Sequence, residues 1–370
     1  MRLPHLDFVR QAAAVLVVIE HVRAAIFIPF SAVQNANIFV KIFYALTTFG
    51  HQAVMIFFAL SGFLVGGKAI NLVLEGRFDP LIYIIRRLSR LLIVIIPALV
   101  FTFLFDTMGG TFGDKAAYDG SLGAVIPSLS KGETVSHGWQ AFFGNLFFLQ
   151  TITVPTYGSN GPLWSLAYEF WYYILGPAIV IALMGRVSLM GKIISAVITL
   201  ILLIALPHAI TILFIVWAAG ALAAFAVSHE TVKVWVKKFY IAPLLLGPAV
   251  VMSVLSLSPS HKVPDLLLGL VFAVALPSLA VIPSPIKIYN RLSYGFAEMS
   301  YSLYLVHFPL IVACAAIFIW PTRMAPNPEA FALFFGLVII SVIWGAIVYW
   351  MFERHTVKFC LLYTSDAADE

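Results

Sequence analysis

Charged residues are scarce in this chain of 370 residues. They account for 11% of the sequence, whereas hydrophobic residues account for 62%. A soluble domain carries roughly a quarter of its residues as Asp, Glu, Lys or Arg. The composition therefore excludes an ordinary soluble domain and predicts an all-α, multi-pass membrane protein surrounded by the lipid bilayer.

Cysteine is rarer still, with only Cys314 and Cys360 in the whole chain. Two cysteines without metal-ligand spacing exclude a disulfide framework and a zinc-thiolate site, and we expect no metal. The net charge of +5 does not indicate a nucleic-acid partner, because in a membrane protein the distribution of charge between loops carries the information.

The two ends of the chain contribute little to the predicted function. Met1–Asp7 is short and no small-residue cleavage site follows the first apolar run, so we expect that run to remain as an anchor. The tail CLLYTSDAADE resembles a translated sequencing adapter. We therefore assign residues 1–359 to one membrane domain and treat 360–370 as a non-native tail.

Apolar runs predict about ten transmembrane helices. They lie at about 8–28, 40–66, 84–108, 161–185, 190–207, 209–227, 240–258, 264–283, 298–319 and 331–352. A further run at 142–152 is too short to cross a bilayer and is typical of an interfacial or re-entrant segment. With both termini in the cytoplasm, sixteen of the 22 Lys and Arg residues lie on the cytoplasmic side and four in outside loops, as the positive-inside rule requires.

Arg10 and His21 are the ionisable residues of most interest on the first predicted helix. Eleven positions apart, they share one helix face about 16 Å apart. A charge in hydrocarbon costs on the order of 3 kcal/mol on insertion scales, so such residues usually have a use. An imidazole can abstract a hydroxyl proton or accept an acyl group. A packing histidine and a topogenic Arg10 paired with Asp7 are the alternatives, and Glu20 points about 100° away from His21.

Arg86, Arg87 and Arg90 form a cationic cluster at the start of the third predicted span. Cytoplasmic flanks normally carry arginine, which is the simpler interpretation. Three guanidinium groups at a helix start also suit a phosphate-rich ligand, because they cannot deprotonate and the helix N-terminus attracts anions.

Glu169 is the carboxylate of interest on the fourth predicted span. Asn160, Gly161 and Pro162 signal the start of this helix, and Ser165, Glu169, Tyr172 and Tyr173 form one polar stripe on it. We expect Glu169 to need a partner such as His21, an arginine or a hydroxyl, with a purely structural hydrogen bond as the alternative. Ser300, Tyr304 and His307 form a similar stripe, which we interpret as packing. Ser61 and Gly62 predict a close helix contact.

Five stretches in order resemble the membrane acyltransferase-3 family, the sugar O-acyltransferases that modify bacterial surface polysaccharides and some exported small molecules. They are LDFVR (6–10) followed by His21, IFFALSGFL (56–64), RRLSR (86–90), GPLWSLAYEFWYY (161–173) and SYSLYLVHFPL (300–310). The chain departs from the family pattern at Met55, where many members have Asp, and after Glu353, where many have Pro.

The resemblance implies a bacterial inner-membrane enzyme that moves an acyl group, usually acetyl, from cytoplasmic acyl-CoA to a hydroxyl of a carbohydrate or small-molecule acceptor outside. It assigns His21 the central catalytic role, Glu169 an essential polar role, and Arg10, Arg86, Arg87 and Arg90 to donor binding or site architecture. A secondary transporter of an anionic or glycan substrate is the alternative, although the chain lacks internal repeats. A structural membrane subunit is a weaker one. The oligomeric state stays open, a homo-oligomer included.

Overall fold

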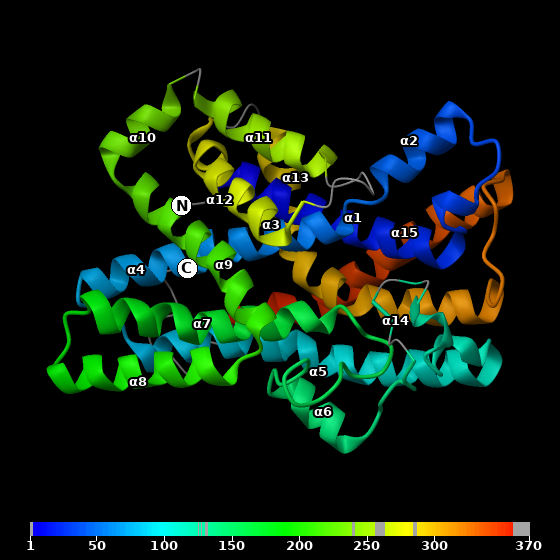
Figure 1. Cartoon of the computed structure of the whole chain (residues 1–370), viewed down its shortest axis with the longest axis horizontal. Helices are drawn as coiled ribbons and strands as arrows, with labels where there is room; N and C mark the ends of the chain where they lie inside the picture. The colour runs from blue at the N-terminus through cyan, green and yellow to red at the C-terminus, as the bar shows by residue number, and fades with distance from the viewer. Residues whose placement is uncertain are drawn as a thin grey trace. The chain divides into compact units, whose positions relative to one another are not determined.

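A computed structural model describes residues 3–124, 126, 128–129, 132–238, 241–255, 263–283 and 287–357. Every regular element in these ranges is a helix (Figure 1). This confirms the predicted all-α class. The predicted non-native tail, residues 360–370, lies outside the described residues.

Within the described ranges, six helical segments are long and apolar enough to cross a membrane. They are Ile38–Leu74, α5 (Pro80–Phe112), α7 (Leu163–Met184), α9 (His208–Ser228), α14 (Ser300–Phe318) and Pro328–His355, which contains α15 (Pro328–Met351). Helices also occupy the other four predicted spans: α1 (Pro4–Ile26), α8 (Leu189–Ala205), α11 (Ile241–Leu255) and α12 (Asp265–Val281). The chain is a multi-pass membrane protein, and the count of ten spans stays a prediction.

The contacts of the chain divide it into two compact units. The first unit comprises Met1–Ala13, His51–Arg87 and Tyr168–Ala297, and the second comprises Ala14–Gly50, Leu88–Ala167 and Glu298–Glu370. In the first unit α9 packs against α12, α10 (Glu230–Lys237) and α4 (Gly67–Leu74), and α11 packs against α12. This unit also contains most of α13 (Lys287–Glu298). In the second unit α14 packs against α15.

A π-helical turn, Gly62–Gly66, follows α3 (Gly50–Ser61) in the first unit. A Cβ atom added at Gly62 would lie 1.9 Å from the carbonyl oxygen of Trp217 on α9. Only glycine allows the two backbones to approach this closely. The close helix contact predicted at Ser61 and Gly62 is therefore confirmed.

The second predicted span is interrupted in the structure. It comprises α2 (Ile38–Leu46) and α3, separated by residues 47–49. The Thr47 hydroxyl donates to the Phe43 carbonyl at 2.7 Å, and the Thr48 hydroxyl donates to the Tyr44 carbonyl at 2.9 Å. Threonine hydroxyls that bond back to the preceding turn offer its carbonyls an alternative to continued helix.

The long loop between α5 and α7 carries the short helix α6 (Trp139–Leu146). Trp139, Phe143 and Phe147 lie four residues apart and are exposed, whereas Ala141, Gly144 and Asn145 are buried. An exposed aromatic stripe is typical of a helix that rests at a membrane interface. The remaining helical turns are η1 (Phe30–Ala32), η3 (Lys115–Ala117), η4 (Ser121–Ala124) and η5 (Glu353–His355).

Glu353 caps the start of α14 in the second unit. Its carboxylate is buried and accepts hydrogen bonds from the Ser302 backbone N–H at 3.0 Å and the Ser302 hydroxyl at 2.6 Å. An anionic acceptor at a helix N-terminus satisfies amide groups that have no partner within the helix. Glu353 therefore has a clear structural role, although the residues after it depart from the family pattern.

We expect Glu353→Ala to lower the free energy of unfolding by about 2 kcal/mol, because Ser302 would keep buried donors without their acceptor. Thermal unfolding of the detergent-solubilised protein measures the effect as a lower midpoint. Glu329→Ala, which removes an exposed carboxylate from the first turn of α15, is the matched control. Equal midpoints for the two variants would contradict the capping role.

Candidate active site

His21 lies on α1 in the second unit and forms a hydrogen-bonded chain with α14. Its Nδ1 is 2.9 Å from His307 Nε2, and the two rings are nearly parallel, with an interplanar angle of 8°. His307 Nδ1 is in turn 2.9 Å from the Leu303 carbonyl oxygen. His307 is fully buried and His21 is 8% exposed. The pair joins segments that are 286 residues apart in sequence.

The donor and acceptor roles along this series of hydrogen bonds follow from the Leu303 carbonyl at its end. A carbonyl oxygen can only accept, so His307 Nδ1 donates to Leu303, and in a neutral ring His307 Nε2 is then an acceptor. His21 Nδ1 therefore donates to His307, and its Nε2 keeps a free lone pair. The Ser128 hydroxyl lies 3.2 Å from this Nε2 and can donate to it. The geometry thus presents a basic ring nitrogen to a hydroxyl group.

Ser128 reaches His21 because its backbone packs against the start of the next span. A Cβ atom at Gly161 would lie 1.7 Å from the Ser128 carbonyl oxygen, so glycine is required there. The neighbouring Asn160 donates through Nδ2 to Thr102 Oγ1 at 3.1 Å and to the Leu305 carbonyl at 2.9 Å. These contacts join α5, α14 and the loop beside His21.

The predicted polar face of α14 is confirmed, but its interpretation as simple packing is incomplete. Tyr304 places its hydroxyl 2.7 Å from Ser165 Oγ, and the next residue of the stripe, His307, bonds His21. The signal was present in the i, i+3 spacing of these residues. The sequence could not reveal that His21 is the partner of His307, because His21 lies on a helix that is distant in sequence.

Glu20 is not joined to His21 in the structure, as its direction on the helix predicts. A Cβ atom at Gly50 would lie 2.2 Å from Glu20 Oε2, which places the carboxylate against the start of α3. Arg23, one turn further along α1, is buried and donates to the Thr47 carbonyl at 3.3 Å.

Glu169 lies on α7 in the first unit, where a hydroxyl is its partner. Tyr173, one turn later, donates to Glu169 Oε1 at 2.5 Å. Ser61 donates to the Tyr173 hydroxyl at 3.3 Å, and Trp217 Nε1 donates to Ser61 at 3.2 Å. The predicted stripe therefore places Glu169 at the end of a relay of donors, which stabilises a carboxylate away from water.

The predicted cationic residues are divided between the two units. Arg10, Arg86 and Arg87 belong to the first unit, and Arg90 belongs to the second. Arg10 Nη2 lies 3.2 Å from Asp7 Oδ1, which is the pair expected under the alternative, topogenic interpretation of Arg10. Arg86 and Arg87 are half-buried, whereas Arg90 is exposed.

Arg87 and Glu169 each contact one of two tyrosines of the first unit. The Arg87 guanidinium lies 5.9 Å from the centre of the Tyr83 ring. Tyr173 donates to Glu169, and Tyr83 and Tyr173 line the same cavity. Opposite charges beside neutral hydroxyl groups form a polar cluster within an otherwise apolar helix bundle.

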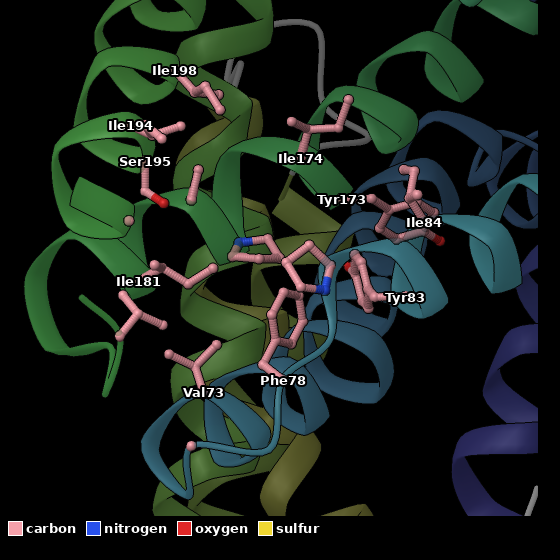
Figure 2. Close-up of a pocket in the computed structure, with 16 residues that line it drawn as sticks. Val73, Phe78, Tyr83, Ile84, Tyr173, Ile174, Ile181, Ile194, Ser195 and Ile198 are labelled. Atoms are coloured by element: carbon pink, nitrogen blue, oxygen red, sulfur yellow. The ribbon is translucent and has the colours of Figure 1, made fainter. Parts of the chain in front are cut away.

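This polar cluster borders an apolar cavity of about 500 Å³ in the first unit. Figure 2 shows Tyr83 and Tyr173 on one side of it and Ile181, Ile194 and Ile198 on the other. A cavity lined by hydrophobic side chains with a few polar groups is typical of a small-molecule site.

A second cavity of about 660 Å³ lies where the start of α1 meets α12 and α13 in the first unit. It has a more polar lining, which includes His5, Asp7, Asn290 and Arg291. Asp7 is also the partner of Arg10. The cavity therefore provides hydrogen-bonding groups and a cation next to one of the predicted donor-binding residues.

Comparison with protein-family models gives a match over nearly the whole chain. A family model described as an acyltransferase domain matches residues 3–351. No curated protein and no solved structure matches the chain.

Proposed function

Because the chain belongs to the acyltransferase 3 family and is a membrane acyltransferase, we propose that it moves an acyl group from cytoplasmic acyl-CoA to a hydroxyl of an exported or cell-surface glycan. Acetyl is the proposed acyl group, and the cytoplasmic membrane of a bacterium is the proposed location. The observation that carries the proposal is the lone pair of His21 Nε2, which faces a hydroxyl group at 3.2 Å.

His21 is the proposed catalytic residue. As a general base, Nε2 takes the proton of the acceptor hydroxyl while the oxygen of that hydroxyl bonds to the acyl carbon of acyl-CoA. The carbon–sulfur bond then breaks, and the leaving thiolate of CoA takes a proton from His21. The Ser128 hydroxyl stands where an acceptor hydroxyl would bind. The alternative route, in which Nε2 itself attacks the thioester and forms an acyl-imidazole, uses the same lone pair.

His307 has a positioning role in either route. It accepts the Nδ1–H of His21 and so fixes which ring nitrogen is basic. When His21 gains a proton or an acyl group, the Nδ1–H becomes a stronger donor and the same hydrogen bond strengthens. The pair therefore stabilises the charged form of His21 that either route passes through.

The donor side of the proposal rests on topology and charge. With both termini in the cytoplasm and ten spans, Arg10 and the cluster Arg86, Arg87 and Arg90 lie at the cytoplasmic side. Phosphate groups of CoA match these guanidinium forks. The 660 Å³ cavity beside Asp7 offers space for the nucleotide portion. We propose that Glu169 is an essential polar residue that holds the polar cluster around Arg87 in place.

The direct test uses purified protein, radiolabelled acetyl-CoA and the cell-envelope glycan fraction of a bacterial host as acceptor. We expect label to enter the glycan and to depend on the protein. Transport of a glycan without transfer of label would overturn the proposed function and favour the transporter alternative.

Binding of the donor gives a separate prediction. We expect CoA to raise the thermal midpoint of the detergent-solubilised protein, because a ligand that binds only the folded state stabilises it. The double variant Arg86→Ala/Arg90→Ala should lose most of that shift. Lys192→Ala, which removes a cation from the first turn of α8, is the control and should keep it. An unchanged shift in the arginine variant would contradict phosphate binding at this cluster.

A further inference from the structure

A second buried carboxylate lies near the end of α5, and neither the sequence patterns nor the proposed mechanism uses it. The Asp106 side chain is 0% exposed. It accepts hydrogen bonds from the Ser159 backbone N–H at 2.7 Å and the Ser159 hydroxyl at 2.6 Å. A third partner, His137 Nε2, lies 2.8 Å away. Burying a carboxylate is costly unless hydrogen bonds compensate for the lost water, and these three donors satisfy both oxygens of Asp106.

His137 joins the buried carboxylate to an accessible surface. Its side chain is 28% exposed. The ring is packed edge-on against Phe103 and Tyr157, with centroid distances of 5.8 Å and 5.5 Å. Because Asp106 takes the Nε2–H, the Nδ1 of the neutral ring is an acceptor. Within the described part of the chain, Asp106 is the only hydrogen-bond partner of the His137 ring.

The segment 157–161 connects this dyad to the surroundings of His21, and all of these residues belong to the second unit. At one end the Gly158 N–H donates to the carbonyl of Ser136, the residue before His137, at 2.9 Å. At the other end Gly161 packs against Ser128, whose hydroxyl bonds His21. One short turn therefore supports both histidines.

We propose that His137, held by Asp106, is a binding residue for the acceptor, and that its Nδ1 accepts a hydrogen bond from a hydroxyl of a carbohydrate or other polyol. Asp106 is the positioning residue, because it fixes both the tautomer and the orientation of the ring. Phe103, which is exposed and packs edge-on against the His137 ring, supplies apolar surface beside the polar group, the combination that small-molecule sites use. The proposal rests on the proposed acyl transfer to a hydroxyl.

The test measures steady-state kinetics with radiolabelled acetyl-CoA and serial dilutions of the glycan fraction that the wild-type protein labels. The variants are His137→Phe, which keeps an aromatic ring without a lone pair, and Asp106→Asn. We expect the apparent KM for the glycan to rise by about tenfold in both, the loss of one hydrogen bond, with kcat, the KM for acetyl-CoA and the thermal shift by CoA unchanged. His137→Gln, whose amide can still accept, should recover part of the affinity.

Asp119→Asn is the matched control, because Asp119 is an exposed carboxylate in the same long loop. A wild-type glycan KM in His137→Phe would overturn the proposal. So would a parallel loss of kcat, both KM values and the CoA shift, since that pattern is structural. A wild-type protein that transfers no label overturns the proposed function itself, which separates the two failures.

Discussion

His21→Ala is expected to lower the rate of acyl transfer by about 10²- to 10⁴-fold, which is the usual contribution of a well-placed general base. The expected loss is larger if His21 carries the acyl group, because no other nucleophile replaces it. The variant should remain folded, since the loss of one imidazole with its two hydrogen bonds leaves the apolar contacts of α1 in place. Label transfer measures the first effect, and the thermal shift by CoA reports that the donor still binds.

His208→Ala is the control, because His208 is an exposed imidazole at the start of α9. It should transfer label at the wild-type rate. Activity retained in His21→Ala would overturn the assignment of the catalytic residue. A rapid-quench measurement without acceptor separates the two routes: a burst of free CoA equal to the enzyme concentration indicates an acyl-histidine, and its absence indicates direct transfer in a ternary complex.

His307→Phe is expected to reduce kcat by about 10²-fold, in the range of losses when a positioning partner of a functional histidine is removed. The phenylalanine ring cannot accept the Nδ1–H of His21, so the lone pair is no longer confined to Nε2. His307→Gln, whose amide oxygen can accept this hydrogen, should retain more activity. The ordering of the two variants is the diagnostic result, because a purely structural role predicts that the bulkier aromatic ring would be tolerated better.

Tyr301→Phe serves as the control on the same helix. It removes one hydrogen bond from α14 to the Leu91 carbonyl and leaves the His21 contact intact. Its kcat should stay close to that of the wild type. If His307→Phe and Tyr301→Phe have equal activity, the hydrogen bond between the two histidines does not contribute to catalysis.

Hydropathy predicts the helices well, because the bilayer requires long apolar segments. It places their ends less well, because ends depend on local hydrogen bonds. Hydropathy predicts the third span at 84–108, but α5 begins at Pro80. The Asp79 carboxylate accepts from the N–H groups of Leu81 and Ile82 at 2.9 and 3.0 Å, which starts the helix earlier. The break at Thr47 and Thr48 was missed because the mean hydropathy of the run around it stays high despite these two residues.

Helical spacing likewise predicts the contacts that stay on one helix. Arg10 with Asp7 and Glu169 with Tyr173 are both confirmed as neighbours one turn apart. The bond between His21 and His307 joins distant helices, so no local pattern reports it. Ser128 lies in an irregular loop, where neither periodicity nor a motif distinguishes one serine from another. The dyad of Asp106 and His137 was missed for the same reason.

The hydrogen-bonded chain that begins at Ser128 ends at the carbonyl oxygen of Leu303. An amide carbonyl is far too weak a base to accept a proton from His307, so the chain cannot pass protons onward. A proton that reaches His21 from outside the site must leave through the same ring nitrogen. Chemistry at His21 Nε2 can therefore proceed without the hydrogen-bonded chain acting as a route for protons past His307.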